Sequence, residues 1–486
     1  MKVLVVGGGT AGLVTALILK RKLDVEVDIV RSKEIGTVGV GEGSTEHFAT
    51  FLKTIGLDQY HFIRETNATL KIGIKFENWN PERTYLHSIG KEYDELAGQY
   101  PYLYGKEISS NNSKSLCSEL NWNDKVNRWF SNQREEWPTN QFHFNTHMMN
   151  DYLSFVANQM GIKIYDDEIS DVILKEGGQI GRVKGKERDY KYDFYVDATG
   201  FKRMLIGRVG AEWKSFGEYM KMNSAITFQT EHEDDENISM TTLARGMDYG
   251  WMFKIPTWDH IGNGYIYDSN YIGEDEAKKE VEDFLGKEIK IGKRFSFDPG
   301  YLKNSWTNNC VAVGLAAAFV EPLEATSIGT TIQQAFLISH RLSNYDNSSI
   351  DSYNKSFTNI MENIRDFICL HYVTPRRDTQ FWKDVSKMPL PESLSEKMKR
   401  WKNHLPISED FCGDSDYTLF NANNYTIVLE GLDLFDRNSI RKEYMNKSPI
   451  VRNAADELSL NQKRFIESIA TISHRSHIQM IRDVFA

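Results

Sequence analysis

The sequence predicts an α/β fold in which a layer of parallel strands is interleaved with a β-rich region and followed by a helical C-terminal region. The first 30 residues read as strand, glycine turn, helix and strand, the order that opens a parallel sheet. Residues 214–300 carry alternating runs typical of strands. Beyond about residue 330, apolar residues recur with the 3.6-residue period of helices.

The composition is ordinary for a soluble globular protein. The chain has 486 residues, of which 40% are hydrophobic and 26% are charged. The net charge of −10 argues against a nucleic-acid partner, because binding to phosphates requires a basic surface. Aromatic residues make up 12% of the chain, which suits a protein that packs against planar ligands.

Cysteine spacing and hydropathy favour a cytoplasmic protein. The four cysteines lie far apart and form no metal-binding or redox spacing, so we expect free thiols and no metal site. The N-terminus reads as a first strand and not as a signal peptide. The longest nearly apolar run, Val311–Val320, is about half of what a membrane crossing needs.

A glycine pattern, Gly-x-Gly-x-x-Gly, joins the first expected strand (Lys2–Val6) to the first expected helix (Ala11–Lys22). Glycines let the backbone approach a pyrophosphate, whose charge then lies at the helix N-terminus. Strand, turn and helix fall in the right order, so the pattern predicts dinucleotide binding rather than a plain turn. The expected contacts are Gly7, Gly9, Thr10, Ala11 and Gly12.

The second expected strand, Val25–Val30, is followed by Arg31 and lacks the acidic residue that usually contacts the ribose. Arg31 could bind a 2′-phosphate or could be a solvated charge at the strand end, and we favour the second interpretation.

Two later segments, Tyr192–Gly200 and Cys310–Ala318, again pair a strand with a turn of small residues. Each alone could be a buried packing site. Together with the first turn, they resemble the Rossmann-like FAD domain of flavoprotein hydroxylases, in which distant segments return to one extended cofactor. This resemblance favours FAD over NAD and adds Gly200 and Leu315 as expected contacts.

Periodicity also predicts the remaining elements. We place a domain over residues 1–340, with a β-rich insertion at about 70–150 and 210–300, and a helical region over 341–486. The individual expectations are a surface loop at Ser109–Asn123, strands within Arg182–Val196 and at Gly264–Tyr267 and Thr426–Leu429, and helices at Thr331–Leu342, Ser356–Leu370 and Gln462–Val484.

Residues 69–76 alternate with period two, which predicts a strand with one apolar face. The other face carries Lys71, Gly73 and Lys75. The two lysines would lie about 13 Å apart, so they cannot both reach one small reacting atom. From the pattern alone, a solvated strand face is the better interpretation.

Three further segments carry distinctive residues: Gly39–Thr45, Gly250–Pro256 and Phe319–Ile328. With these segments, the chain resembles the flavin-dependent halogenases of the tryptophan halogenase-like family almost from end to end. Shorter matches to that family are Phe142–Phe144, Ile261–Tyr265, Arg365–Phe367 and His371–Tyr372.

The resemblance assigns roles to the first two of these segments. In the family, the motif Trp-x-Trp-x-Ile-Pro separates the flavin from the substrate and so blocks direct oxygen transfer. Here that motif has phenylalanine in the second tryptophan position, and its residues are Trp251, Phe253, Ile255 and Pro256. Gly39–Thr45 resembles the family's flavin-contacting strap, and the expected flavin contacts in this strap and beyond it are Val40, Gly41, Glu42 and Ile328.

The resemblance also implies that Lys71 and Glu324 are catalytic, with Lys75 at a flanking position. From the residues alone, an acidic group near a helix start, such as Glu321 or Glu324 around Pro322, often only balances the helix dipole.

The family's halide is held by backbone N–H groups at the positions of Thr326 and Ser327, which can bind an anion whatever their side chains are. Ala325 stands where the family commonly has serine.

A flavin-dependent halogenase takes FAD as FADH2, O2 and a halide ion, and makes hypohalous acid. Lys71 would then orient this acid by a hydrogen bond or become a haloamine, and Glu324 would accept the ring proton. The resemblance implies a separate flavin reductase and a small, electron-rich aromatic substrate bound by the helical region 341–486. Because Phe253 and Ala325 remove polar groups near the expected path, we expect bromide or iodide to be used better than chloride.

Two other functions remain as alternatives: an FAD-dependent aromatic hydroxylase and a non-catalytic flavin-binding protein. Halide dependence would separate a halogenase from a hydroxylase. The substrate itself stays open among tryptophan, indoles, phenols and carrier-tethered compounds, because Asn424 and Tyr425 replace the family's usual tryptophan. A homodimer is a further open expectation.

Overall fold

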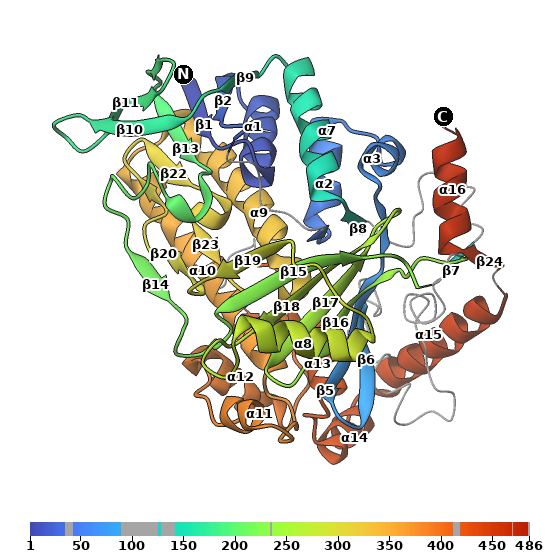
Figure 1. Cartoon of the computed structure of the whole chain (residues 1–486). Coiled ribbons are helices and arrows are strands. Elements are labelled where there is room, and N and C mark those ends of the chain that lie inside the picture. Colours follow the sequence, from blue (N-terminus) through green and yellow to red (C-terminus); the bar gives the residue numbers. More distant parts are fainter. Residues whose placement is uncertain are drawn as a thin grey trace.

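In the computed structural model, β-sheets and the helices that pack on them form the body of the protein (Figure 1). The residues it describes are 1–34, 42–88, 125–127, 141–233, 236–411, 418–468 and 470–484. Two of the expected strap contacts, Val40 and Gly41, and the expected surface loop at Ser109–Asn123 lie outside these residues. Of Glu42, only the backbone is described, in strand β3 (Glu42–Gly43).

A six-stranded sheet with the order β21-β22-β13-β1-β2-β9 forms the first layer. Its strands are β1 (Lys2–Val6), β2 (Glu26–Arg31), β9 (Lys163–Asp166), β13 (Phe194–Asp197), β21 (Trp306–Thr307) and β22 (Cys310–Ala312). Strand β1 pairs in parallel with β2 and β13, and β13 pairs in parallel with β22. The expected α/β fold with a parallel sheet is therefore confirmed, and the ends of β1, β13 and β22 lie at one edge.

Helices pack on this sheet (Figure 1). Helix α1 (Thr10–Lys22) follows β1 directly, and Gly12–Leu19 within it are all buried. Such all-round burial explains why its sequence is apolar without a clear polar stripe. Neighbouring helices are α2 (His47–Ile55), α3 (Gln59–Thr66) and α7 (Thr146–Gln159).

The second large sheet has seven strands in the order β19-β15-β18-β17-β16-β5-β6. Its strands are β5 (Gly73–Asn80), β6 (Arg83–Ser88), β15 (Ser224–Thr230), β16 (Thr241–Gly246), β17 (Gly250–Pro256), β18 (Ile261–Tyr267) and β19 (Lys293–Ser296). Helix α8 (Glu274–Leu285) covers one face of this sheet through Ala277 and Val281. This sheet thus combines two segments that are far apart in the sequence, β5–β6 and β15–β19.

Small sheets complete the β structure. They consist of β3 with β4 (Thr69–Lys71) and β8 (Gln141–Phe144), β10 (Ile169–Leu174) with β11 (Ile180–Gly185) and β12 (Asp189–Tyr190), β14 (Trp213–Ser215) with β20 (Gly300–Leu302) and β23 (Ala318–Phe319), and β7 (Lys125–Asn127) with β24 (Thr471–Ser473). The expected strands within Arg182–Val196 and at Gly264–Tyr267 are confirmed.

The chain beyond residue 326 is mainly helical. Its helices are α9 (Thr326–Arg341), α10 (Asn347–His371), α11 (Gln380–Val385), α12 (Glu392–Trp401), α13 (Ala422–Gly431), α14 (Arg437–Met445), α15 (Pro449–Ser468) and α16 (His474–Val484). Helix α9 contains nearly all of the helix expected at Thr331–Leu342, and α10 contains the one expected at Ser356–Leu370.

The strand expected at Thr426–Leu429 is wrong, because these residues lie inside helix α13. Their β-branched, apolar run is typical of a strand, but it is buried on all sides of a helix. Asn421 starts that helix, since its side chain accepts the N–H of Asn423 while its own N–H donates to Asn424.

The single helix expected at Gln462–Val484 is also wrong. Helix α15 ends at Ser468, and β24 then pairs antiparallel with β7 before α16 begins at His474. The β-branched residues Thr471 and Ile472 make these backbone bonds with a partner far away in the sequence, which local periodicity cannot reveal.

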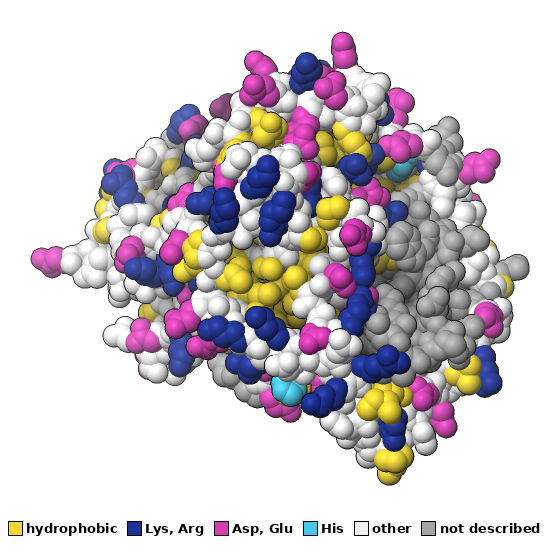
Figure 2. Space-filling view, turned by 90° about the horizontal axis from the view of Figure 1, so that it is seen from below, with side chains coloured by type: hydrophobic (Ala, Val, Ile, Leu, Met, Phe, Trp, Pro, Cys, Tyr) yellow, Lys and Arg dark blue, Asp and Glu magenta, His cyan; other side chains and the backbone are white. Residues whose placement is uncertain are grey.

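The surface carries charges of both signs. On the face seen in Figure 2, apolar side chains gather in a central hollow, and Lys and Arg side chains border it. Across the described part of the chain, no helix combines the length and the apolar character that a membrane crossing requires.

Candidate active site

A cavity of about 1240 Å³ connects the first sheet, the second sheet and the start of α9. Among its lining residues are most of those predicted from the sequence: Gly7, Gly9, Thr10, Ala11, Lys71, Gly200, Trp251, Phe253, Ile255, Leu315, Glu324, Thr326, Ser327 and Ile328. Gly12 and Pro256 are described but do not line it. Segments that are up to about 300 residues apart in the sequence thus meet around one space.

The glycine turn after β1 packs against the turn after β13. Gly7 has φ +118°, and a Cβ on it would lie 2.2 Å from the carbonyl oxygen of Ala198. A Cβ on Gly12 would lie 1.9 Å from the carbonyl oxygen of Gly7. Both positions therefore require glycine if the two turns are to keep this close packing.

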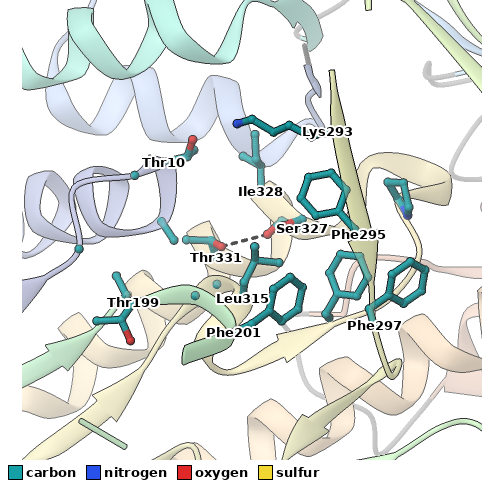
Figure 3. Close-up of a pocket in the computed structure, with 18 of the residues that line it drawn as sticks. Thr10, Thr199, Phe201, Lys293, Phe295, Phe297, Leu315, Ser327, Ile328 and Thr331 are labelled. Carbon is teal, nitrogen blue, oxygen red and sulfur yellow. Dashed lines mark hydrogen bonds between the residues drawn. The ribbon is translucent and has the colours of Figure 1, made fainter. Parts of the chain in front are cut away.

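The N-terminus of α1 is suited to an anion. Its N-cap, Gly9, has no side chain to bond the first N–H groups, and the first turn carries no acidic residue. The free N–H groups and the helix dipole favour a negative group at this end. Thr10, Thr199 and Leu315 all line the cavity (Figure 3), and this end of the helix fits the pyrophosphate of a dinucleotide such as FAD.

Arg31 is not the solvated charge at the strand end that we favoured from the sequence. Its guanidinium donates to Ser154 Oγ at 3.1 Å, and its stem covers Gly8, where a Cβ would lie 2.4 Å from Arg31 Cδ. Arg31 therefore belongs to the cavity wall.

Aromatic rings that sequence reasoning missed form another part of the wall (Figure 3). The rings of Phe297 and Phe319 lie 4.7 Å apart, and Phe201 lies 5.4 Å from Phe319. Phe295 lines the cavity beside them. Such rings give an apolar surface suited to a planar ligand.

Strand β17 contributes a rigid wall. Trp251 is buried, and its Nε1 donates to Glu321 Oε2 at 3.1 Å, which also accepts from the Tyr372 hydroxyl at 2.7 Å. Burial raises the pKa of Glu321 to about 7, although these two hydrogen bonds oppose the rise. Phe253 faces Gly264, where a Cβ would lie 2.4 Å from the phenylalanine ring. Trp251 and Phe253 are thus held in fixed positions.

Lys71 is buried and not on the solvated strand face that the alternation indicated, with only 1% of its surface exposed. The expected single strand breaks at Ile72: β4 pairs with β8, while β5 pairs with β16 and β6. Lys71 and Ile74 therefore both line the cavity, whereas Lys75 does not.

The ammonium of Lys71 lies in an environment of low polarity. Its Nζ donates to the carbonyl oxygen of Ser44 at 2.9 Å. Burial lowers the pKa of Lys71 to about 8, and the attraction of the Glu324 carboxylate limits this fall. Close by, burial and the charge of Lys71 lower the pKa of His143, whose Nε2 bonds the Thr242 hydroxyl at 2.9 Å.

The backbone of Lys71 is fixed by a distant residue. The N–H of Leu70 donates to His474 Nε2 at 3.0 Å, and His474 Nδ1 donates to the carbonyl oxygen of Ile238 at 2.9 Å. The C-terminal helix α16 thus anchors the strand that carries the lysine.

Glu324 is nearly buried and lies on an unusual turn. Pro322 is the N-cap of a short 3-10 helix, Leu323–Ala325, that is irregular at Glu324, and α9 begins only at Thr326. Glu324 and Ala325 both have left-handed backbone conformations, with φ 68° and 56°. Two adjacent non-glycine residues in this region indicate strain that functional sites commonly hold.

Two histidines bond the carboxylate of Glu324. Oε1 lies 2.7 Å from His87 Nδ1 and 3.1 Å from His371 Nε2. Burial by itself would raise the pKa of Glu324, but the two histidines lower it to about 2. Sequence reasoning did not predict either histidine as a site residue, because they lie 237 and 47 residues from Glu324 along the chain.

The start of α9 is suited to a small anion. Thr326 and Ser327 open this 16-residue helix, whose first turn has no acidic residue. The hydroxyl oxygen of Thr326 is buried and has no hydrogen-bond partner among the described residues. Free N–H groups and this unpaired hydroxyl fit a halide ion. Within the described ranges, no group of three or more His, Cys, Asp or Glu residues could hold a metal.

Comparisons with known proteins agree with this geometry. Residues 2–445 match the family model described as tryptophan halogenase. The chain is 30% identical to tryptophan 6-halogenase SttH of Streptomyces toxytricini, over 84% of this chain and 85% of that protein. It is 29% identical to tryptophan 7-halogenase RebH of Lentzea aerocolonigenes, over 94% of each.

The structure is also similar to a solved one. The flavin-dependent tryptophan C-6 halogenase (chlorinase) Tar14 of taromycin biosynthesis superposes with a TM-score of 0.87. The two are 26% identical, and the superposition covers 99% of both chains. The similarity therefore extends over nearly the whole length of the chain.

Proposed function

The chain belongs to the tryptophan halogenase family, whose members are flavin-dependent enzymes, and we propose that it uses reduced FAD, O2 and a halide to halogenate an electron-rich aromatic compound. One observation carries this proposal: Lys71 and Glu324 are both buried, and they line the same cavity as the dinucleotide turn and the start of α9. A hydroxylase has no evident use for such a buried lysine and carboxylate.

The residues around the cavity would hold FAD along its length. The pyrophosphate would lie at the N-terminus of α1, against the turn that contains Gly7, Gly9, Thr10, Ala11 and Gly12. Further contacts would come from Val40, Gly41, Glu42, Gly200, Leu315 and Ile328. When bound, reduced FAD would supply two electrons to O2, and the partly reduced oxygen is the oxidant that converts the halide into hypohalous acid. We propose that a separate flavin reductase provides the reduced FAD.

The halide would bind at the start of α9, at the N–H groups of Thr326 and Ser327. The segment with Trp251, Phe253, Ile255 and Pro256 would separate the flavin from the organic substrate. Support comes from the buried hydrogen bond that fixes Trp251 to Glu321. This wall would confine hypohalous acid, which otherwise reacts without selectivity.

Lys71 and Glu324 would carry out the transfer to the ring. With a pKa of about 8, Lys71 is mostly an ammonium at neutral pH and can donate its proton to the oxygen of hypohalous acid. The oxygen–halogen bond then breaks, water leaves, and the carbon–halogen bond forms. Glu324 stabilises the cationic ring and accepts the proton displaced from it. The lysine amine can regain a proton near neutral pH.

FAD and the organic substrate would be bound by different parts of the chain. We assign FAD binding to residues 1–340, with the β-rich insertion at about 70–150 and 210–300, and substrate binding to the helical region 341–486. His371 on α10 and Asn424 on α13 support this assignment, because the first bonds Glu324 and the second bonds His87 beside it.

Tryptophan is the first substrate to test, because the relatives SttH and RebH are named for it. Indoles, phenols and carrier-tethered aromatics follow, because Asn424 occupies a position where the family commonly has tryptophan.

The decisive assay is halide dependence. The purified chain is incubated with FAD, NADH, a flavin reductase and one aromatic compound, with and without bromide, and products are identified by mass spectrometry. A monobrominated product that requires both bromide and the reductase is expected. A hydroxylated product without halide would support a hydroxylase instead, and binding of FAD without any product would support a non-catalytic protein.

A further inference from the structure

The two histidines that bond Glu324 differ in the partners of their second ring nitrogens. His87 Nε2 lies 3.1 Å from the amide nitrogen of Asn424. The orientation of that amide is fixed, because its oxygen accepts the N–H of Asn421 at 2.9 Å. An amide nitrogen can only donate, so Nε2 of His87 carries no proton. His87 is therefore neutral, and its single N–H is the Nδ1–H that points at Glu324.

His371 has the opposite arrangement. Its Nδ1 lies 2.8 Å from the carbonyl oxygen of Phe367, which can only accept, so Nδ1 carries a proton. Its Nε2 lies 3.1 Å from Oε1 of Glu324. That contact is a hydrogen bond only if one more proton lies between the two atoms. The proton is either on His371, as an imidazolium, or on Glu324, as a carboxylic acid.

The surroundings of Glu324 favour the imidazolium. Oε1 already accepts the N–H of His87 at 2.7 Å, and a carboxylate oxygen accepts such a hydrogen bond more strongly than the hydroxyl oxygen of a carboxylic acid does. Lys71, on β4, adds a positive charge that attracts the carboxylate. Among the described residues, Tyr85 on β6 also interacts with Glu324, and its phenol stays neutral because burial raises its pKa.

We infer that His371 is a protonated positioning residue whose charge keeps Glu324 ionised inside the cavity, whereas His87 is a neutral residue that holds the carboxylate through one hydrogen bond. The inference rests on the proposed function, in which an ionised Glu324 accepts the ring proton. Oε2 of Glu324 makes no hydrogen bond to any described residue, so it is the oxygen that can take that proton. The histidines thus bond Oε1, whereas Oε2 accepts the ring proton.

The charge of His371 matters because the ring is buried among apolar side chains. The imidazole ring lies 4.9 Å from Phe367 and 5.0 Å from Phe76, and it is fully buried. A carboxylate in such surroundings takes up a proton unless a cation or several donors stabilise it. A neutral carboxylic acid could neither stabilise a cationic ring nor accept its proton.

Two substitutions separate charge from hydrogen bonding. His371→Gln keeps an N–H near the position of Nε2 but removes the charge, and His87→Asn keeps an N–H near the position of Nδ1. In His371→Gln, the pKa of Glu324 should rise, so activity should fall as the pH falls, about tenfold for each pH unit below the new pKa. His87→Asn should lower the rate without adding this acid limb, because no charge is lost.

The direct test is the protonation state of the two rings. The ¹⁵N NMR spectrum of histidine-labelled protein distinguishes rings with one and two protonated nitrogens. Of the 12 histidines, His371 and His87 are assigned by the signals that disappear in His371→Gln and in His87→Asn. We expect two protonated nitrogens on His371 and one on His87 at pH 7. A singly protonated His371 would overturn the inference.

A further variant, Glu324→Gln, tests the ion pair without any change at position 371. In Glu324→Gln the carboxylate is gone, so His371 should lose its second proton and its signals should shift to those of a neutral ring. Unchanged His371 signals would contradict the ion pair. These spectra are recorded without any halogenation reaction. Absence of product in the halogenation assay would therefore refute the proposed function, whereas the spectra alone decide the protonation states of His371 and His87.

Discussion

Replacing Lys71 with methionine should make the protein more stable and inactive at the same time. The substitution removes a buried ammonium and keeps most of the apolar stem. In the unfolded chain, the lysine keeps its proton up to a pKa near 10.5, whereas in the native protein burial lowers the pKa to about 8. Below pH 8 both states are charged, and the native state bears the full cost of the buried charge.

The lowering of the pKa from 10.5 to about 8 corresponds to about 3 kcal/mol in the free energy of unfolding. Loss of the bond from Lys71 to the Ser44 carbonyl offsets about 1 kcal/mol of this gain. We therefore expect Lys71→Met to be more stable than the parent by about 1–3 kcal/mol at pH 7. As the pH rises from 8 to 10.5, the parent loses its buried charge and the difference should shrink.

Urea unfolding followed by tryptophan fluorescence at pH 7 and at about pH 9.5 measures this difference. Lys75→Met is the matched control, because Lys75 lies outside the cavity lining and should give a small difference at both pH values. The reasoning about a buried charge fails if Lys71→Met is less stable than the parent at pH 7. It also fails if the difference between them does not change with pH.

Three further substitutions test other parts of the site. Glu324→Gln should lower halogenation about 100-fold or more while FAD still binds, and retention of most activity would remove Glu324 from the mechanism. Gly7→Ala should weaken FAD binding in a titration, because its Cβ would lie 2.2 Å from the carbonyl oxygen of Ala198; unchanged affinity would contradict the packing argument. With equal halide concentrations, brominated product should dominate over chlorinated product, and Ala325→Ser should move the ratio toward chloride; a dominant chlorinated product in the parent would refute this preference.

Local patterns were sufficient for the sheet and the turns. The unit around α1 could be predicted because each step has its own signal: an apolar run, a glycine pattern and a helical period. The two later turns were recognisable by their small residues, and the structure brings Gly200 and Leu315 to the same cavity as Gly7. Parallel strands make this outcome predictable, since their carboxyl ends share one edge.

Patterns failed where tertiary contacts decide the conformation. The alternation around Lys71 indicated a solvated face, but the strand breaks at Ile72 to join two sheets. Only the resemblance to the family pointed to that lysine. Within the helix Ala422–Gly431, the segment Thr426–Leu429 read as a strand because burial on all sides removes helical periodicity from the sequence.

The roles of His87 and His371 could not be predicted from the sequence for a different reason. A single histidine in a strand or at the end of a helix has no characteristic spacing, and its hydrogen-bond partners come from other elements. Their roles depend on which atoms lie next to each nitrogen, and sequence patterns do not record that.

The most direct test of the account compares Lys71→Ala with Lys75→Ala in the halogenation assay. Both variants should bind FAD like the parent, because neither lysine belongs to the dinucleotide turns. Product should disappear in Lys71→Ala and persist in Lys75→Ala, since only Lys71 lines the cavity. Halogenated product from Lys71→Ala at the level of the parent would contradict the claim that this buried lysine delivers the halogen to the substrate.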